Sequence, residues 1–423
     1  MPLRLSGVVC TTHGTPFSRA RRSLFVFLVL LLLCFMLVIN VALQDVSSTT
    51  VQLDALHDPS TSITRPSETS GVDVPRARIL LVSAMFPLEK SKHSKEEYAY
   101  WLSQFLNPIT TDVYFFAPPS FAPTVQSVRG SGNITIDTAY GSPFDIPPLR
   151  GLEEKYRSMH NLDREKFRHS PELYAIWNAK PFFVHAAVQA LRKQGKEYDY
   201  VFWNDAGSFR NTHMYSEWPD AGRVQQIWDV GEKITGTPKE KLLFFPLAGM
   251  PAAKMRYWKE DMGPVDYDVS EGSFFGGSPE TIAWWQAVYY SYHDYYLSRG
   301  LFVGKDQTLI NALFLLFPER VISVWFGDPA APARSGLIPA FDHRPLGACG
   351  SEWFYYQFWM ADSTTREKMR GLWMALTKWR DWEWWAKRQR CRLTGVVAMR
   401  DVLQTLFGAR WTPPPRSVPL RTL

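Results

Sequence analysis

The stretch from Tyr198 to Arg210 constrains the fold of this chain most strongly. Its residues 200–203 form a short apolar run bounded by polar residues, which is typical of an interior strand in a parallel sheet. Asp205 and Gly207 follow directly, so we expect the strand to end in a polar turn. A carboxylate in that place lies where open α/β sheets bind ligands, although an Asp can equally cap backbone N–H groups of the turn.

Strand-like and helix-like segments alternate on both sides of this stretch. We expect further strands at 78–84, 112–117, 134–136, 242–246 and 321–325, and helices at 96–106, 170–180, 181–191 and 280–298, with one more beginning at 306. Such alternation is typical of βα units and predicts an α/β fold with a mostly parallel sheet flanked by helices. Pro181 is expected to begin a new helix, since proline fits the first helical turn.

An uncharged segment at 24–43 precedes the region with this alternation. It is long enough for one helix to cross a bilayer. Three arginines lie at 19–22, and the next Lys or Arg is Arg65. The positive-inside rule then predicts a transmembrane signal-anchor at 24–43 with a cytosolic tail at 1–23. A cleaved signal peptide is the alternative, but its apolar core is normally shorter, about 7–15 residues, and ends at small residues.

The chain after the anchor is expected to lie in the lumen of the Golgi or the ER. Residues 44–75 are rich in Ser, Thr, Asp and Pro without a sustained period, which predicts a flexible stalk. Asn133 begins an Asn-Ile-Thr glycosylation triplet, and Cys349 and Cys391 could form one disulfide. The net charge of +6 is not gathered into a stripe of basic and aromatic residues, so nucleic acid is not an expected partner.

Several polar residues outside the first stretch are candidates for chemistry. Lys180 is expected near the sheet edge that carries Asp205, where it could neutralise a diphosphate or only pair with an acid. Asp306 and Gln307 occupy the first turn of an expected helix, where an acid also suits the helix dipole. His343 lies beside an Asp in a loop, a position in which a histidine is more often a bystander than a ligand.

Two adjacent glycines, Gly276 and Gly277, follow two phenylalanines. Glycines in such a place indicate that the backbone closely approaches either a ligand or another strand, and both alternatives stay open. Arg210 lies shortly after Asp205 and could bind a phosphate through two guanidinium nitrogens. All three residues are therefore candidates for ligand binding.

Four segments of the chain, in the same order, resemble the HtrL/YibB family of proposed glycosyltransferases. They are 171–181, 202–210, 272–277 and 304–307, which read PELYAIWNAKP, FWNDAGSFR, GSFFGG and GKDQ. The resemblance extends over about residues 78–325 and leaves the anchor, the stalk and the C-terminal part outside. It implies a GT-A-like fold, in which a nucleotide-diphospho-sugar binds at the sheet.

The resemblance also implies a metal site after the central strand. In GT-A enzymes an Asp-x-Asp motif there holds Mn²⁺ or Mg²⁺ against the donor diphosphate, and such cations need only one or two protein carboxylates. This chain has Trp203-Asn204-Asp205 instead, so Asp205 would hold the metal without the first acid, and Asn204 would contact the ribose. His343 resembles the C-terminal histidine that completes the metal site in many of these enzymes.

Roles in catalysis and donor binding follow from the same resemblance. The pair Asp306-Gln307 would lie near the acceptor. In an inverting enzyme Asp306 would deprotonate the acceptor hydroxyl, and in a retaining enzyme it would stabilise positive charge on the sugar. Lys180 and Arg210 would neutralise the leaving diphosphate. The glycine pair at 276–277 would let donor or acceptor lie against the backbone.

The C-terminal part of the chain has a different composition. We expect a catalytic domain at 76–360 and an extension rich in Trp and basic residues at 361–423. Residues 396–407 show an amphipathic helical pattern, and such a helix could lie on a membrane surface or pack on the catalytic domain. The proline-rich tail around 413–415 is expected to be disordered.

The sequence as a whole predicts a single-pass type II membrane protein with a luminal glycosyltransferase domain. The enzyme would move a sugar from a nucleotide-sugar donor to a glycan or glycoconjugate acceptor, assisted by Mn²⁺ or Mg²⁺. One alternative is a non-catalytic relative that binds glycans or partners, since the first acid of the metal motif is missing. Another is a cleaved, secreted enzyme of a different class on the same fold, such as a nucleotide-sugar hydrolase.

Overall fold

The computed structural model describes residues 76–90, 93–325, 353–377, 393 and 395–422. The expected anchor and stalk, together with His343, Cys349 and Cys391, lie outside these residues. Among the helices that are described, none is both long and apolar enough to cross a membrane. The described residues belong to one compact unit, Pro75–Leu423.

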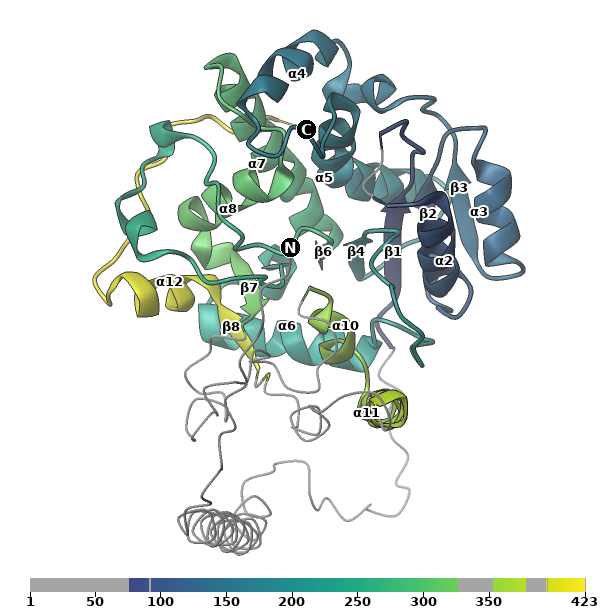
Figure 1. The fold of residues 1–423 in the computed structure, drawn as a ribbon. Helices are drawn as coiled ribbons and strands as arrows, with labels where there is room; N and C mark the ends of the chain where they lie inside the picture. The colour runs from purple at the N-terminus through teal and green to yellow at the C-terminus, as the bar shows by residue number, and fades with distance from the viewer. Residues whose placement is uncertain (1–75, 91–92, 326–352, 378–392, 394, 423) are drawn as a thin grey trace, which may run out of the picture. The chain divides into compact units, whose positions relative to one another are not determined.

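An eight-stranded sheet runs through this unit (Figure 1). Its strands are β1 Ile79–Ala84, β2 Asp112–Phe116, β3 Ile134–Asp137, β4 Tyr200–Asn204, β5 Leu243–Phe244, β6 Phe274–Gly277, β7 Val321–Val324 and β8 Val396–Ala398. They lie in the order β3-β2-β1-β4-β6-β5-β7-β8. The strands β3, β2, β1 and β4 are mutually parallel, and β5 is parallel to β7. In contrast, β6 is antiparallel to both its neighbours, and β8 is antiparallel to β7.

Helices cover both faces of the sheet. The α-helices are α2 Lys95–Leu106, α3 Ala122–Arg129, α4 Glu153–Met159, α5 Pro171–Arg192, α6 Ala221–Thr235, α7 Pro279–Ser298, α8 Asp306–Leu316, α10 Tyr355–Trp359, α11 Ser363–Thr377 and α12 Met399–Phe407. One hydrophobic core joins the sheet to α5, α7, α8 and α12, and the other joins it to α2, α6 and α10. Figure 1 shows α5, α7 and α8 on one side and α6 and α10 on the other.

Alternate residues of the strands enter these two cores. Leu80 and Val82 of β1 belong to the core that includes α5, whereas Ile79 and Leu81 belong to the core that includes α2. Every residue of β1 and β4 is buried, as expected for strands that are covered on both faces. The predicted α/β class is therefore confirmed, and the sheet is mixed, parallel from β3 to β4 and antiparallel at β6 and β8.

Two predicted element boundaries were wrong. Pro181 does not begin a second helix but lies inside the single helix α5. The long buried face of α5 outweighs the one backbone hydrogen bond that a proline removes. Residues 396–398 form β8 beside β7, and the helix predicted from 396 begins only at Met399. That helix packs in the core of the unit, which is one of the two alternatives that its amphipathic pattern left open.

The prediction of a disordered tail was also wrong. The Ser417 backbone N–H donates to Oε2 of Glu260 at 2.8 Å, and the Arg421 backbone N–H donates to the Ser291 hydroxyl at 2.8 Å. Glu260 also accepts a hydrogen bond from the Tyr292 hydroxyl at 2.6 Å. The tail is thus fixed along α7 by a buried carboxylate that no local pattern in the tail could reveal.

The carboxyl ends of β1 and β4 are the expected place for a ligand. In the strand order, the chain goes from β1 to β2 in one direction and from β4 to β5 in the other direction. Neighbouring parallel strands whose connections diverge in this way mark the usual ligand position of open α/β sheets. We refer to the end of the sheet at which β1 and β4 finish as the carboxyl edge, and to the end at which they begin as the amino edge.

Candidate functional site

The turn after β4 and the start of β6 meet at the carboxyl edge. The Asp205 N–H donates to the Ser273 carbonyl at 2.8 Å, which continues the pairing of Asn204 with Phe274. Because β6 is antiparallel to β4, its amino end lies beside the carboxyl end of β4. The structure therefore places Asp205 next to the segment 270–273, which leads into β6.

A buried ammonium group lies between two carboxylates at this edge. Lys180 Nζ lies 3.2 Å from Oδ1 of Asp205 and 3.0 Å from Oδ2 of Asp306, and it donates to the Gly272 carbonyl at 2.9 Å. The Lys180 side chain is only 5% exposed. Burial lowers the pKa of Lys180, but Asp205 and Asp306 raise it more, so the group stays charged. We call Lys180, Asp205 and Asp306 the carboxyl-edge centre.

The two carboxylates of this centre differ in exposure. The Asp205 side chain is 34% exposed, and the Trp203 indole N–H donates to its Oδ1 at 2.6 Å. The Asp306 side chain is 6% exposed, and the Gln307 N–H donates to its Oδ1 at 2.9 Å. Burial raises the pKa of Asp306, and Lys180 opposes that shift. Asp205 is therefore the acid of the centre that a ligand can reach, whereas Asp306 faces Lys180.

Amide side chains of α8 hold the segment 270–273 in place. The Gln307 side-chain amide donates to the Ser270 carbonyl at 2.7 Å, and Oδ1 of Asn311 accepts from the Ser270 N–H at 3.0 Å. The family resemblance placed Gln307 near the acceptor. In the structure, Gln307 binds the backbone of the segment that contains Gly272. Its contacts show a positioning role within the described residues.

Asn178 connects α5 to the turn before α8. Its side-chain amide donates to the carbonyls of Val303 and Gly304 at 3.0 and 3.2 Å, and its oxygen accepts from the Tyr289 hydroxyl at 2.6 Å. These bonds keep the first turn of α8 beside α5, where Lys180 lies. No role was predicted for Asn178, because a buried amide is recognised by its distant partners and not by its neighbours in sequence.

Three other predicted ligand-binding residues have partners within the protein. Asn204 is fully buried, and its side chain bonds to the Asp205 carbonyl and the Ser208 hydroxyl, each at 3.1 Å. The glycine pair at 276–277 lies inside β6. A Cβ at Gly276 would come within 2.4 Å of the Val201 carbonyl oxygen, and one at Gly277 within 2.7 Å of the Leu242 carbonyl oxygen. The close approach that the glycines indicated is thus to neighbouring strands.

Arg210 and Asn133 both lie at the surface. The Arg210 guanidinium lies over the rings of Trp101 and Phe354, with its carbon 4.3 and 5.0 Å from the ring centres. It is exposed beside the Asp205 turn and remains available to an anion. Asn133 is exposed at the start of β3, where a glycan would meet no core residue.

Glu271, which sequence reasoning did not single out, is an unusual buried acid. It is 4% exposed, and its Oε1 accepts from the Ser273 N–H at 3.0 Å. Its Oε2 is buried and has no hydrogen-bond partner among the described residues. Burial raises the pKa of Glu271 to about 7, with a smaller rise from Asp205 and an opposing effect of Lys180.

Among the described residues of the centre, Asp205 decides whether a divalent cation could bind there. No group of three or more His, Cys, Asp or Glu side chains surrounds a common position in the part of the chain that the structure describes, and His343 lies outside that part. The carboxyl-edge centre carries two carboxylates against one ammonium, which leaves an excess negative charge. Asp205 is partly exposed, and its Oδ2 accepts a long hydrogen bond from Lys180 at 3.5 Å, which leaves a lone pair for a cation whose other ligands are substrate oxygens and water.

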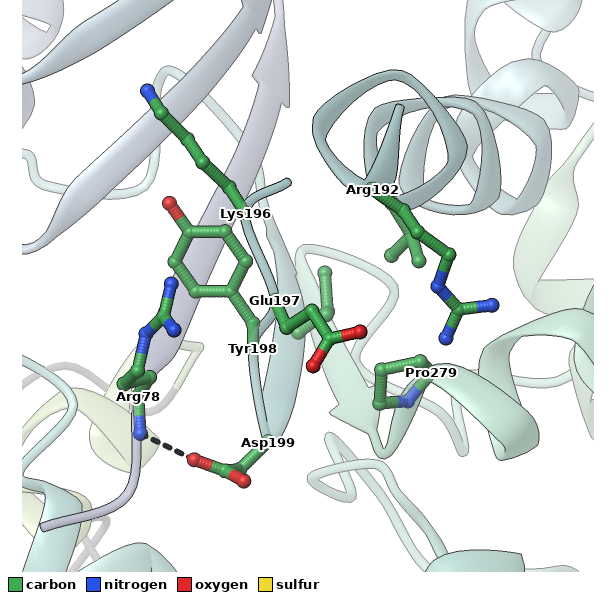
Figure 2. Close-up of a pocket in the computed structure, with 9 residues that line it drawn as sticks. Arg78, Arg192, Lys196, Glu197, Tyr198, Asp199 and Pro279 are labelled. Atoms are coloured by element: carbon green, nitrogen blue, oxygen red, sulfur yellow. Dashed lines mark hydrogen bonds between the residues drawn. The ribbon is translucent and has the colours of Figure 1, made fainter. Parts of the chain in front are cut away.

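Two cavities of about 230 and 310 Å³ lie at the amino edge, away from this centre. Figure 2 shows the smaller one, with Arg78, Arg192 and Lys196 around it and the Arg78 backbone N–H donating to Asp199 at 2.7 Å. The charged side chains here are exposed and solvated. We place the candidate site at the carboxyl edge, because charges that are removed from water mark functional sites better than open volume.

No protein-family model matches this chain, and a search of curated proteins finds no match. Among solved structures, the apo form of mouse xyloside xylosyltransferase 1 is 8% identical to this chain. That match covers 58% of this chain and 83% of the mouse chain, with a TM-score of 0.33. A likeness this weak identifies neither the fold nor the function, which rest on the residues described above.

Proposed function

We propose that this protein is a glycosyltransferase that binds a nucleotide-sugar donor over the carboxyl edge of its sheet. The observation that carries the proposal is the set of partners of Lys180, namely Asp205, Asp306 and the Gly272 carbonyl. Lys180 and its three partners make four groups, and each of the four segments that resemble the HtrL/YibB family contributes one of them. Segments that lie far apart in sequence thus meet in one buried, charged centre at the carboxyl edge of the α/β sheet, where such sheets usually bind ligands.

Charge supports the participation of a divalent cation. A donor diphosphate is anionic, and Lys180 is already outnumbered by Asp205 and Asp306. The centre alone would therefore repel the diphosphate. Mn²⁺ or Mg²⁺ held by Asp205 would supply the positive charge that stabilises the leaving diphosphate.

The residues in and beside the centre would then have different roles in positioning the cation and the donor diphosphate. Lys180 would hold the Asp205 carboxylate in one orientation, and the exposed Arg210 would contact the diphosphate from the α2 side. For Asp306 the contacts favour a positioning role, since its buried carboxylate is paired with Lys180. Asp306 could act as the base only after turning from Lys180 toward the acceptor hydroxyl.

The acceptor would be a glycan or glycoconjugate, and the protein would act in the Golgi or ER lumen. The support for this location is the uncharged run at 24–43 with arginines before it and the glycosylation triplet at Asn133. A type II anchor would place Pro75–Leu423, the compact unit, on the luminal side.

Release of nucleotide from a panel of UDP-, GDP- and CMP-sugars tests the proposal, with and without glycan acceptors. We expect one donor class to be consumed in an acceptor-dependent way, and Asp205→Asn to lower the rate at least about a hundredfold. Arg192→Met at the amino edge is the matched control and should keep the wild-type rate. If nucleotides bind but no donor is consumed, the non-catalytic alternative replaces the proposal. Consumption without an acceptor points to a hydrolase.

A further inference from the structure

The buried oxygen Oε2 of Glu271 needs a partner. Buried polar atoms are almost always hydrogen-bonded, and an exception in a native structure indicates strain, a bound water or ion, or a catalytic role. Oε1 of the same carboxyl has its partner, the Ser273 N–H at 3.0 Å, while Oε2 has none among the described residues. One oxygen of this carboxyl is therefore hydrogen-bonded, and the other is a buried acceptor without a described partner.

Glu271 and Asp205 are attached to the same residue from two sides. The Asp205 N–H donates to the Ser273 carbonyl at 2.8 Å, and Glu271 accepts from the Ser273 N–H. The next residue after Glu271 is Gly272, whose carbonyl accepts from Lys180 Nζ. The two acids also influence each other electrostatically, since Asp205 raises the pKa of Glu271. Backbone contacts thus place Glu271 beside the turn that carries Asp205.

We propose that Glu271 is a second protein ligand, with Asp205, for a divalent cation of the Mn²⁺ or Mg²⁺ class. The inference rests on the proposed function for what the cation does, which is to bind the donor diphosphate. Hard cations of this class usually take one or two carboxylates from the protein and complete their coordination with phosphate oxygens and water. The segment that leads into the neighbouring antiparallel strand β6 would thereby supply the acid that is missing from Trp203-Asn204-Asp205.

The charges of the four ionisable groups support this ligand pair. Asp205, Asp306 and Glu271 carry three negative charges when ionised, and Lys180 carries one positive charge. A divalent cation makes the sum zero. Without it, an ionised Glu271 would be a buried carboxylate beside an already negative centre, which the low-dielectric interior disfavours.

Titration calorimetry of the full-length protein with Mn²⁺, alone and with UDP, GDP or CMP, tests the ligand pair. We expect Asp205→Asn and Glu271→Gln each to weaken Mn²⁺ binding at least about tenfold, since each removes one carboxylate ligand. Glu260→Gln is the control for replacing a buried Glu. Glu260 already has its oxygens bonded to Ser417 and Tyr292, so Mn²⁺ affinity should not change.

Thermal unfolding separates a ligand from a structural acid. Without Mn²⁺, Glu271→Gln should unfold at the wild-type temperature or higher, because it removes a buried charge. At one fixed Mn²⁺ concentration, the cation should then raise the midpoint of the variant by less than that of wild type. Unchanged Mn²⁺ affinity in Glu271→Gln, with a loss in Asp205→Asn, overturns the inference and leaves the proposed function intact. Mn²⁺ binding that neither variant weakens, or none by wild type under any of these conditions, overturns the inference together with the cation's role in the proposed function.

Discussion

The two edges of the sheet carry similar residues in opposite environments. At the amino edge, Arg192 and Lys196 surround an open cavity, and Asp199 binds the Arg78 backbone at the surface (Figure 2). At the carboxyl edge, Lys180 is only 5% exposed and is shared by two acids. Water already satisfies the charges of the amino edge, whereas the charges of the carboxyl edge depend on one another. Burial of charge, and not the size of an opening, therefore distinguishes the candidate site.

Removing the central cation should have the largest effect. Lys180→Met leaves Asp306 buried without its counter-charge, and breaking a buried ion pair costs about 3–5 kcal/mol. The matched change at the amino edge, Arg192→Met, removes an exposed cation and should alter the free energy of unfolding by no more than about 0.5 kcal/mol. Urea denaturation measures both. Equal decreases in the free energy of unfolding of the two variants would show that the charges at the two edges do not differ in burial as described.

The stability of the carboxyl edge should depend on pH through Glu271. Its pKa rises from 4.5 to about 7 on folding, so the folded state holds the proton more tightly than the unfolded state. The stabilisation is complete below the unfolded pKa and is lost as pH rises through the folded pKa. Wild type should therefore lose about 3 kcal/mol relative to Glu271→Gln between about pH 4.5 and 7.

Denaturation of both proteins in a chelator, at several pH values, measures this difference. The chelator excludes any stabilisation by a bound cation. A difference that stays constant across the range would mean that Glu271 is not shifted in the folded protein.

The sheet that joins the two edges should not tolerate a side chain at Gly276. A Cβ there meets the Val201 carbonyl oxygen and the Phe202 ring, so Gly276→Ala should cost about 2–3 kcal/mol. Gly371 in α11 has open space around its Cα, and Gly371→Ala should be neutral or stabilise by up to about 1 kcal/mol. Thermal or urea unfolding compares them. If Gly276→Ala folds normally but fails to bind nucleotide, a ligand contact at this glycine is the better explanation.

The smallest effects should come from neutralising one acid at each edge. Asp306→Asn leaves Lys180 with Asp205 as its one carboxylate and should cost about 2 kcal/mol, whereas Asp199→Asn at the surface should cost about 0.5 kcal/mol. Urea denaturation measures the decrease in the free energy of unfolding for each variant, and the ratio of the two decreases is compared. A larger loss at Asp199 would reverse the comparison between the edges.

Local patterns in the sequence were sufficient for the fold class and for the position of Asp205. Apolar runs of strand length report burial on both faces, and a polar turn after such a run must lie at a sheet edge. The antiparallel strand β6 was not predicted, because two phenylalanines and two glycines show neither alternation nor β-branched residues. Pro181 was misread since the packing that keeps α5 continuous comes from other elements.

The positioning residues of the site depend on contacts between distant parts of the chain. Asn178 binds residues that lie 125 and 126 positions away, and the tail residue Ser417 binds Glu260 from 157 positions away. Neither partner can be inferred from neighbouring residues. Glu271 was missed for the same reason, since only the folded protein shows that one of its oxygens is buried without a partner among the residues that the structure describes.

Nucleotide binding to the carboxyl-edge centre tests the central claim most directly. Thermal unfolding of the purified protein with UDP, GDP or CMP, each with and without Mn²⁺, is sufficient. A ligand at about a hundred times its dissociation constant adds roughly 2.7 kcal/mol, which shifts the midpoint of a chain of this size by about 3–4 °C. We predict that one nucleotide gives this shift, that the shift requires Mn²⁺, and that Asp205→Asn abolishes it while Arg192→Met does not. A shift that survives Asp205→Asn, or no shift with any nucleotide, would contradict the account.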